Sequence, residues 1–232
     1  MQYLGSKNKI AKHLLPIILK NRKPEQYYVE PFMGGGNMID KVEGLRIGND
    51  INYYLIEMWK ALQKGWIPPD VVTEEEYRYY KKCQEIEDPA MVAFIGFLCS
   101  FGTRWFSSFA KNNQNRNYAK VGKNSLMRQL PNMAEVELQN TTYDKLIIPA
   151  NSIIYCDPPY QNTAGYKDSI DHKAFWQWCR ERALEGHQVF ISEYSAPDDF
   201  ICIFEIEHIT SLSSNNNYTK RIEKLFKFEP LF

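Results

Sequence analysis

The stretch Tyr-Tyr-Val-Glu-Pro-Phe-Met-Gly-Gly-Gly, residues 27–36, decides the fold class of this 232-residue chain. Its first four residues are typical of a short strand, and the glycines that follow allow positive φ and let a ligand approach the backbone. A second strand is expected over residues 45–50, where it ends in Asp50, 20 residues after Glu30. The order of strand, glycine-rich turn, helix, strand and acid predicts the opening of a doubly wound α/β sheet.

The acid that ends the second strand indicates a nucleoside cofactor. A carboxylate about 20 residues beyond a glycine-rich turn is typical of a ribose site, because it accepts hydrogen bonds from both ribose hydroxyls. The dinucleotide pattern needs a third glycine, but Asn37, Met38 and Ile39 follow Gly36. The motif therefore favours a nucleoside cofactor other than NAD, and the alternative is a plain strand-to-helix turn without a ligand.

The remaining sequence alternates between helical and strand patterns, with one interruption. Helices are expected at 6–20, from 37 onward, and at 53–64, 73–87, 89–101 and 171–184; strands are expected at 146–148, 152–156, 187–192, 201–209 and 222–228. The last two strands should pair antiparallel around a polar loop at 211–219. Residues 102–134 show little periodicity. We expect one α/β domain from residues 1–67 and 135–232, with residues 68–134 inserted as a mainly helical domain.

The net charge of zero hides an uneven distribution of basic residues. Residues 1–24 and residues 89–134 each hold six Lys or Arg and no acid, and the second stretch also holds aromatic and amide side chains. Such a set suits phosphate contact, base stacking and base-edge recognition, although a solvated basic face is the alternative. The predicted DNA-binding residues are Arg104, Lys111, Arg116 and Lys120.

Several classes of protein are disfavoured by composition. No apolar run approaches the roughly 20 residues of a membrane helix, and we expect no secretory signal. The five cysteines form no close pair and the four histidines have no metal-ligand spacing, so we expect neither a disulfide framework nor a metal site. These features favour a reduced, cytoplasmic compartment.

The turn Asp157-Pro-Pro-Tyr160 is the most specific motif in the chain. Two consecutive prolines fix φ and remove two backbone donors, so the turn presents carbonyl oxygens beside the carboxylate of Asp157. This notch suits a planar group with an exocyclic amine, on which Tyr160 could stack. A base in duplex DNA would reach it only after flipping out of the helix. A strand-ending turn without a ligand is the alternative.

Three motifs together resemble those of one family. Residues 28–36, 48–52 and 155–160 resemble, in the same order, the motifs of the Dam-type (alpha-group) DNA adenine-N6 methyltransferases. Weaker similarities lie at 3–7, 165–166, 171–172, 189–192 and 220–226. The resemblance implies a Rossmann-like class I methyltransferase sheet as the catalytic domain. It also implies that residues 68–134 are a target-recognition domain for double-stranded DNA.

The same resemblance implies a cofactor and a set of site residues. S-adenosylmethionine would donate a methyl group to the N6 amine of a flipped-out adenine, with no covalent enzyme intermediate. Asp157, with Pro158, Pro159 and Tyr160, would form the catalytic motif. The implied cofactor-binding residues are Tyr3, Lys7, Glu30, Phe32, Gly34, Gly36, Asp50, Ile51 and Asp157.

Two segments depart from the family's pattern. Many members have an acid that contacts the cofactor adenine, and Thr142 stands at that position, within Asn140-Thr-Thr-Tyr-Asp144. Residues 100–106 replace the Asn-Arg-x-Gly-Phe-Asn-Gly run of the GATC-reading members, so the resemblance does not extend to GATC specificity.

Other functions remain open from sequence alone. The same chemistry could serve cytosine N4, RNA adenine or a protein amide, and a catalytically silent DNA-binding relative is a further alternative. A nicotinamide-dependent oxidoreductase would leave the Asp157–Tyr160 turn unexplained. Our leading expectation is a monomeric adenine-specific DNA methyltransferase of a bacterium or phage.

Overall fold

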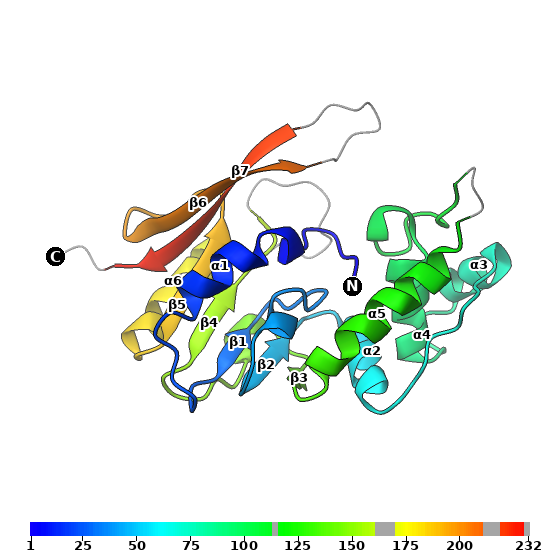
Figure 1. Cartoon of the computed structure of the whole chain (residues 1–232), viewed down its shortest axis with the longest axis horizontal. Helices are drawn as coiled ribbons and strands as arrows, with labels where there is room; N and C mark the ends of the chain where they lie inside the picture. The colour runs from blue at the N-terminus through cyan, green and yellow to red at the C-terminus, as the bar shows by residue number, and fades with distance from the viewer. Residues whose placement is uncertain (113–115, 161–169, 211–218, 230–232) are drawn as a thin grey trace.

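The computed structural model describes residues 1–112, 116–160, 170–210 and 219–229, which form an α/β unit around one sheet (Figure 1). Strands β1 to β5 of this sheet run parallel, β7 is antiparallel to β5, and β6 is antiparallel to β7. The predicted Rossmann-like sheet and its antiparallel pair are confirmed. Among the described residues the strands lie in the order β3 (Glu137–Gln139), β2 (Arg46–Asn49), β1 (Tyr28–Glu30), β4 (Ile153–Cys156), β5 (Gln188–Glu193), β7 (Thr219–Phe228) and β6 (Phe200–Thr210).

Most of the helices lie where the sequence predicts them. Asn52, Thr73 and Asp171 cap three of them by accepting from backbone N–H groups of the first turn, and Thr73 and Glu76 form the capping box. The α-helices of the described residues are α1 (Ala11–Ile18), α2 (Tyr53–Gln63), α3 (Glu74–Lys82), α4 (Pro89–Ala93), α5 (Tyr118–Met133) and α6 (His172–Leu184). Short turns are η1 (Lys7–Lys9), η2 (Ile39–Lys41), η4 (Phe101–Thr103) and η5 (Tyr143–Lys145), and η3 (Phe94–Leu98) is a π-helix that continues α4.

The central strands are apolar on both faces because helices cover both sides of the sheet. Along β1, Tyr28 belongs to the hydrophobic cluster that α1 and α2 complete, whereas Val29 belongs to the cluster on the α6 side. Ile153 and Ile154 of β4 divide between the same two clusters. This alternation fixes the register of β1 against β4, where Tyr28 pairs with Ile153.

Two expectations about secondary structure are wrong, and one helix lies where the sequence shows little periodicity. Residues 102–134 contain α5, whose buried positions include Gly122 and Gln129, so its buried face lacks an apolar repeat. No strand forms at 146–148, where Ile147 is 78% exposed and Pro149 follows; β3 takes the sheet edge instead. After Asn37 the chain makes only the short turn η2 rather than a helix.

The order in which the chain adds strands to the sheet reverses between β1 and β4. From β1 the chain proceeds outward to β2 and β3, then returns to place β4 on the other side of β1. Ligands of open α/β sheets bind outside the carboxyl ends of the strands at such a switch point. Glu30 ends β1 and Asp157 follows β4 directly, so the topology brings two predicted site residues to this crevice.

The segment 68–134 packs against the sheet domain without a break in the core. Helices α3, α4 and α5 gather beyond the β3 edge of the sheet (Figure 1). Trp59 and Leu62 of α2 share one buried cluster with Phe94 and Leu126 of the segment. Its mainly helical character is confirmed, while its boundaries as a domain stay a prediction. Within the described ranges, no helix is long and apolar enough to cross a membrane.

Candidate active site

The carboxylate of Asp157 lies at the carboxyl end of β4 and is paired with Lys7. Lys7 begins η1, and its Nζ lies 2.9 Å from Asp157 Oδ1. The Lys7 side chain is 9% exposed, whereas that of Asp157 is 21% exposed. The ammonium group is therefore held inside the protein, while the Asp157 side chain remains partly exposed.

A second carboxylate and an aromatic ring complete this cluster. Glu223 of β7 places Oε1 3.3 Å from Lys7 Nζ and also accepts the hydroxyl hydrogen bond of Tyr160. Lys7 Nζ lies 4.6 Å from the centroid of the Tyr160 ring, and Tyr194 packs edge-on against that ring at 4.7 Å. Contacts from two other elements thus hold the ring that ends the Asp157-Pro-Pro-Tyr160 turn.

Burial and charge act against each other in this cluster. Burial raises the pKa of Asp157, Lys7 lowers it and Glu223 raises it, with a resulting pKa of about 6. Burial alone would lower the pKa of Lys7, but the neighbouring carboxylates of Asp157 and Glu223 raise it above its ordinary value. Lys7 therefore stays charged, and Asp157 is ionised at neutral pH but within reach of protonation.

The glycine turn is organised by Asp50 and Tyr3. The Gly34 N–H donates to Asp50 Oδ2 and the Asn52 N–H donates to Asp50 Oδ1, both at 2.9 Å. Gly34 has a φ of +51°, and a Cβ there would lie 2.8 Å from the Tyr3 ring. Glycine is required at this position both for its backbone conformation and for the close approach of Tyr3.

The segment that follows β3 lies beside the end of β2. Asn49 donates from Nδ2 to the Thr141 carbonyl and accepts the Thr141 N–H, each at 3.0 Å, and Asn140 donates to the Asp50 carbonyl. These bonds hold the neighbouring Thr142, whose Oγ1 is buried without a hydrogen-bond partner. A polar atom in that state is a candidate ligand contact.

The other predicted cofactor residues differ in their surroundings. Glu30 is 3% exposed and accepts from the Tyr28 hydroxyl at 2.9 Å, and burial raises its pKa well above the ordinary value. Phe32 packs against the rings of Tyr143 and Phe175, whereas Ile51 is 55% exposed. The structure thus gathers Tyr3, Lys7, Glu30, Gly34, Asp50 and Asp157 around the β1–β4 switch point and leaves Ile51 on the surface.

The comparison with known families agrees with this geometry. Residues 3–215 match the D12 class N6 adenine-specific DNA methyltransferases. The chain belongs to this family.

Two similar relatives are modification methylases. The chain is 24% identical over 227 residues to the modification methylase StsI of Streptococcus sanguinis, covering 84% of this chain and 33% of that protein. It is 23% identical over 217 residues to the type II methyltransferase M.FokI of Planomicrobium okeanokoites, covering 80% and 32%. The chain thus spans about a third of the length of these curated relatives.

One solved structure with a similar chain is that of SMU.472 in complex with SAH. The match has 12% identity and a TM-score of 0.36, and it covers 97% of this chain and 53% of the other. The fold assignment given above rests on the strand order and strand directions of this chain.

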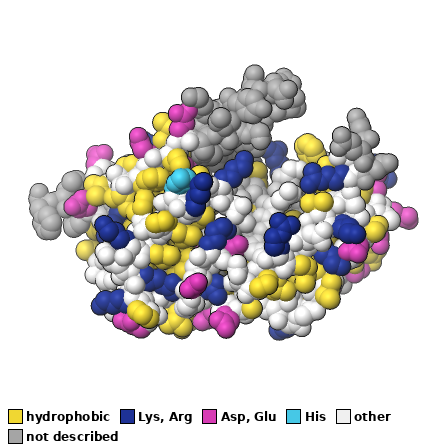
Figure 2. Space-filling view, viewed as in Figure 1, with side chains coloured by type: hydrophobic (Ala, Val, Ile, Leu, Met, Phe, Trp, Pro, Cys, Tyr) yellow, Lys and Arg dark blue, Asp and Glu magenta, His cyan; other side chains and the backbone are white. Residues whose placement is uncertain are grey.

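The predicted DNA-binding residues of this family member all lie at the surface of the inserted segment. Arg104, Lys111, Arg116 and Lys120 are exposed, and the Arg116 guanidinium lies 5.4 Å from the Tyr118 ring centroid. Lys111 pairs with Glu74. On the face that α1 and α5 share, Lys and Arg side chains are scattered rather than gathered in one patch (Figure 2).

Two residues of the site escaped the sequence analysis. Glu223 lies in a predicted strand. The only feature that could have marked it is that an acidic residue stands where the alternating pattern places an inward-facing side chain. Gln129 of α5 donates to the carbonyls of Gly35 and Gly36 at 3.0 and 2.8 Å. No local motif marks Gln129, since its partners lie more than 90 residues away.

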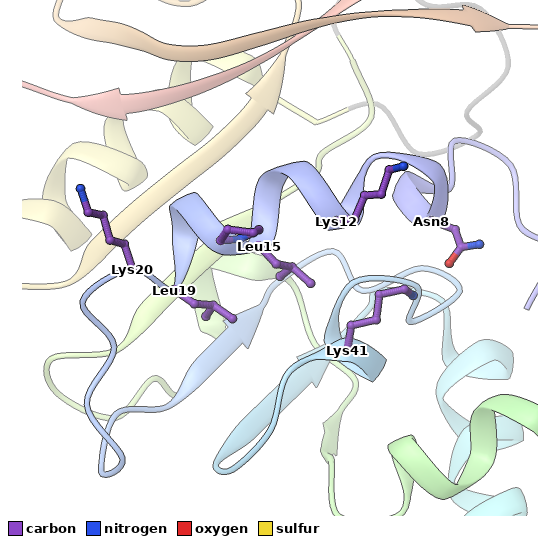
Figure 3. Close-up of a pocket in the computed structure, with 7 residues that line it drawn as sticks. Asn8, Lys12, Leu15, Leu19, Lys20 and Lys41 are labelled. Atoms are coloured by element: carbon purple, nitrogen blue, oxygen red, sulfur yellow. The ribbon is translucent and has the colours of Figure 1, made fainter.

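A surface groove of about 470 Å³ runs along α1, apart from this site. Leu15, Pro16 and Leu19 form its apolar part, and Lys12, Lys20 and Lys41 stand around it (Figure 3). It shares no lining residue with the cluster of Lys7, Asp157, Tyr160 and Glu223, so we assign the chemistry to the cluster and not to the groove.

Proposed function

We propose that this chain transfers a methyl group from S-adenosylmethionine to the N6 amine of an adenine flipped out of double-stranded DNA. The observation that carries the proposal is the Asp157 carboxylate, which is held by Lys7 at the carboxyl end of β4 and is 21% exposed. Membership of the N6 adenine-specific family supports the choice of base.

The residues at the switch point fit this cofactor. S-adenosylmethionine supplies a methyl group activated by a positively charged sulfur. Asp50 follows β2 directly, and a carboxylate is the group that accepts hydrogen bonds from ribose hydroxyls. The Thr142 hydroxyl is buried without a hydrogen-bond partner in the segment after β3. The Lys7–Asp157–Glu223 cluster has one cation and two carboxylates, a charge balance that suits a cationic group.

Each predicted cofactor residue would then take one part of the molecule. Tyr3 and Lys7 would line the pocket, while Glu30, Phe32, Gly34 and Gly36 would border the methionine portion. Burial raises the pKa of Glu30 and so favours its neutral form, in which it would serve as a hydrogen-bonding group. Asp50 and Ile51 would contact the nucleoside portion, with the Thr142 hydroxyl in place of the family's acid.

The notch after β4 would orient the target amine. Asp157 and the Pro158 carbonyl would each accept an N–H, which draws the nitrogen lone pair out of conjugation with the ring. Tyr160 would support the flipped base through its fixed ring, offsetting part of the unstacking free energy. The amine gains positive charge during transfer, and the ionised Asp157 would stabilise that charge.

Residues 68–134 would supply the DNA contacts as a target-recognition domain. The exposed side chains of Arg104, Arg116 and Lys120 would neutralise phosphates, and Lys111 would do so only after leaving Glu74. A single chain would act on one base at a time, as a monomer.

One experiment tests the reaction directly. Purified protein is incubated with S-adenosylmethionine carrying a labelled methyl group and with unmethylated genomic DNA, and the digested nucleosides are identified. Label in N6-methyladenine that disappears in Asp157→Ala supports the proposal. Label in N4-methylcytosine would overturn the base assignment, and bound cofactor without labelled DNA would favour another substrate or a silent DNA-binding protein.

A further inference from the structure

Glu223 reverses the pattern that hydrophobic burial imposes on its strand. On β7 the apolar Ile222 is 49% exposed while the charged Glu223 is 3% exposed, and the next inward residue is Leu225 at 0%. Burying a carboxylate is costly unless it is paired and hydrogen-bonded. A carboxylate at this inward position must therefore have partners that offset the free energy lost by burying it.

The partners of Glu223 are two residues of the candidate active site. Its Oε1 lies 3.3 Å from Lys7 Nζ and accepts the Tyr160 hydroxyl. Lys7 in turn holds Asp157 at 2.9 Å. Glu223 thus joins η1, β7 and the turn after β4 in one network.

Exposure separates the roles of the two carboxylates. Asp157 is 21% exposed and can meet a ligand in the crevice, whereas Glu223 at 3% is enclosed by its partners. Contact with a substrate therefore falls to Asp157, and Glu223 acts on the reaction indirectly, through its bonds to Lys7 and Tyr160 and through its charge near Asp157.

We propose that Glu223 is a positioning residue for methyl transfer, holding the Lys7 ammonium and the Tyr160 ring in one arrangement around Asp157. The inference rests on the proposed function. It explains why β7, which pairs with β5 on the side away from β4, carries a buried acid that contacts Lys7 and Tyr160.

The same geometry ties Glu223 to the pH dependence of the site. The groups that act on Asp157 are Lys7 from η1, Glu223 from β7 and Tyr160 from its own turn, with Tyr155 and Glu30 behind them on β4 and β1. Lys7 lowers the pKa of Asp157 and Glu223 raises it. Loss of the Glu223 charge must therefore shift Asp157 ionisation to lower pH.

The decisive variant is Glu223→Gln, because its amide oxygen can still accept from Tyr160 while its charge is gone. We measure kcat from pH 5 to pH 9 at saturating genomic DNA, together with cofactor affinity and melting temperature. The expected result is a kcat lower by about tenfold or more, with the acidic limb of the profile displaced to lower pH. Glu205→Gln, which removes an exposed charge from β6 of the same hairpin, is the control and should match the wild type.

Two further variants, Glu223→Asp and Tyr160→Phe, keep the inference testable if Glu223→Gln does not fold. Glu223→Asp keeps the charge, so it should lower kcat while leaving the acidic limb in place. Tyr160→Phe removes only the hydroxyl and should also lower kcat. A purely structural role predicts changes in melting temperature with the wild-type limb in every variant.

The outcomes distinguish this inference from the proposed function. Wild-type protein that transfers no methyl group to adenine overturns the function and the inference together. Active wild-type protein whose Glu223→Gln variant keeps both kcat and the acidic limb overturns the inference alone. If Glu223→Gln does not fold, wild-type kcat in Glu223→Asp and Tyr160→Phe has the same consequence.

Discussion

Lys7 and Asp157 lie 150 residues apart in the sequence, yet Lys7 Nζ is 2.9 Å from Asp157 Oδ1. The pair joins the segment before α1 to the turn after β4, and it places a buried cation beside the one carboxylate of the cluster that remains partly exposed. The contact therefore holds Asp157 in place and lowers the pKa that burial raises.

Removing the Lys7 ammonium should move the acidic limb of the kcat–pH profile to higher pH. In Lys7→Met the pKa of Asp157 loses its main lowering influence, so it rises above about 6 and kcat at pH 7 falls by about tenfold or more. A pH profile of methyl transfer measures this, and the displacement is opposite in sign to that of Glu223→Gln. Lys7→Arg keeps the charge and should keep the limb. An unmoved limb in Lys7→Met would contradict the electrostatic role of the pair.

Replacing Asp157 should separate activity from stability. The pKa of Asp157 is raised from 3.8 to about 6, so the folded state binds its proton more tightly than the unfolded chain does. The carboxyl's contribution to stability is thus present below pH 3.8 and is lost as the pH rises through about 6. At pH 8, Asp157→Asn should melt no lower than wild type while methyl transfer falls about 100-fold or more. Calorimetry and labelled transfer test this, and an active variant would remove Asp157 from the mechanism.

The parts of the site predicted from sequence are those whose signal is local. Gly34 and the Asp157–Tyr160 turn follow recognisable strands, and Asp50 ends one, so chain order and the rules of parallel sheets suffice to bring them together. The contribution of Glu223 could not be predicted, because it depends on which neighbour the hairpin meets after folding.

Predictions from charge distribution and hydrophobic periodicity fail where a side chain pairs with residues distant in the sequence. Residues 89–134 contain no acid, but Lys111 pairs with Glu74, and Lys123 lies 2.9 Å from Asp70; both acids come from earlier in the chain. Helix α5 escaped prediction because Gln129 occupies one of its inward positions. There it donates to backbone carbonyls of the glycine turn rather than packing in the core.

The Gln129 amide should couple α5 to the cofactor turn. In Gln129→Met the buried carbonyls of Gly35 and Gly36 lose their donor, at a stability cost of about 1–3 kcal/mol. The turn would loosen, so we expect weaker cofactor binding by calorimetry together with a lower melting temperature. Asn124→Ala on the exposed side of α5 is the control. Unchanged cofactor affinity in a destabilised Gln129→Met would restrict this residue to a structural role.

The basic side chains of residues 68–134 should contribute unequally to DNA affinity. Arg104→Ala and Arg116→Ala should each weaken DNA binding and reduce the slope of log affinity against log salt by about one. The reason is that a variant with one phosphate contact fewer displaces fewer counterions from the DNA when it binds. Lys111→Ala should change the slope less, since Lys111 is paired with Glu74 in the free protein and must break that pair to reach a phosphate. Titration of a labelled duplex at several salt concentrations measures all three variants against wild type. Equal slopes in all four proteins would mean that this stretch is a solvated face, and the search for the DNA contacts would move to other elements.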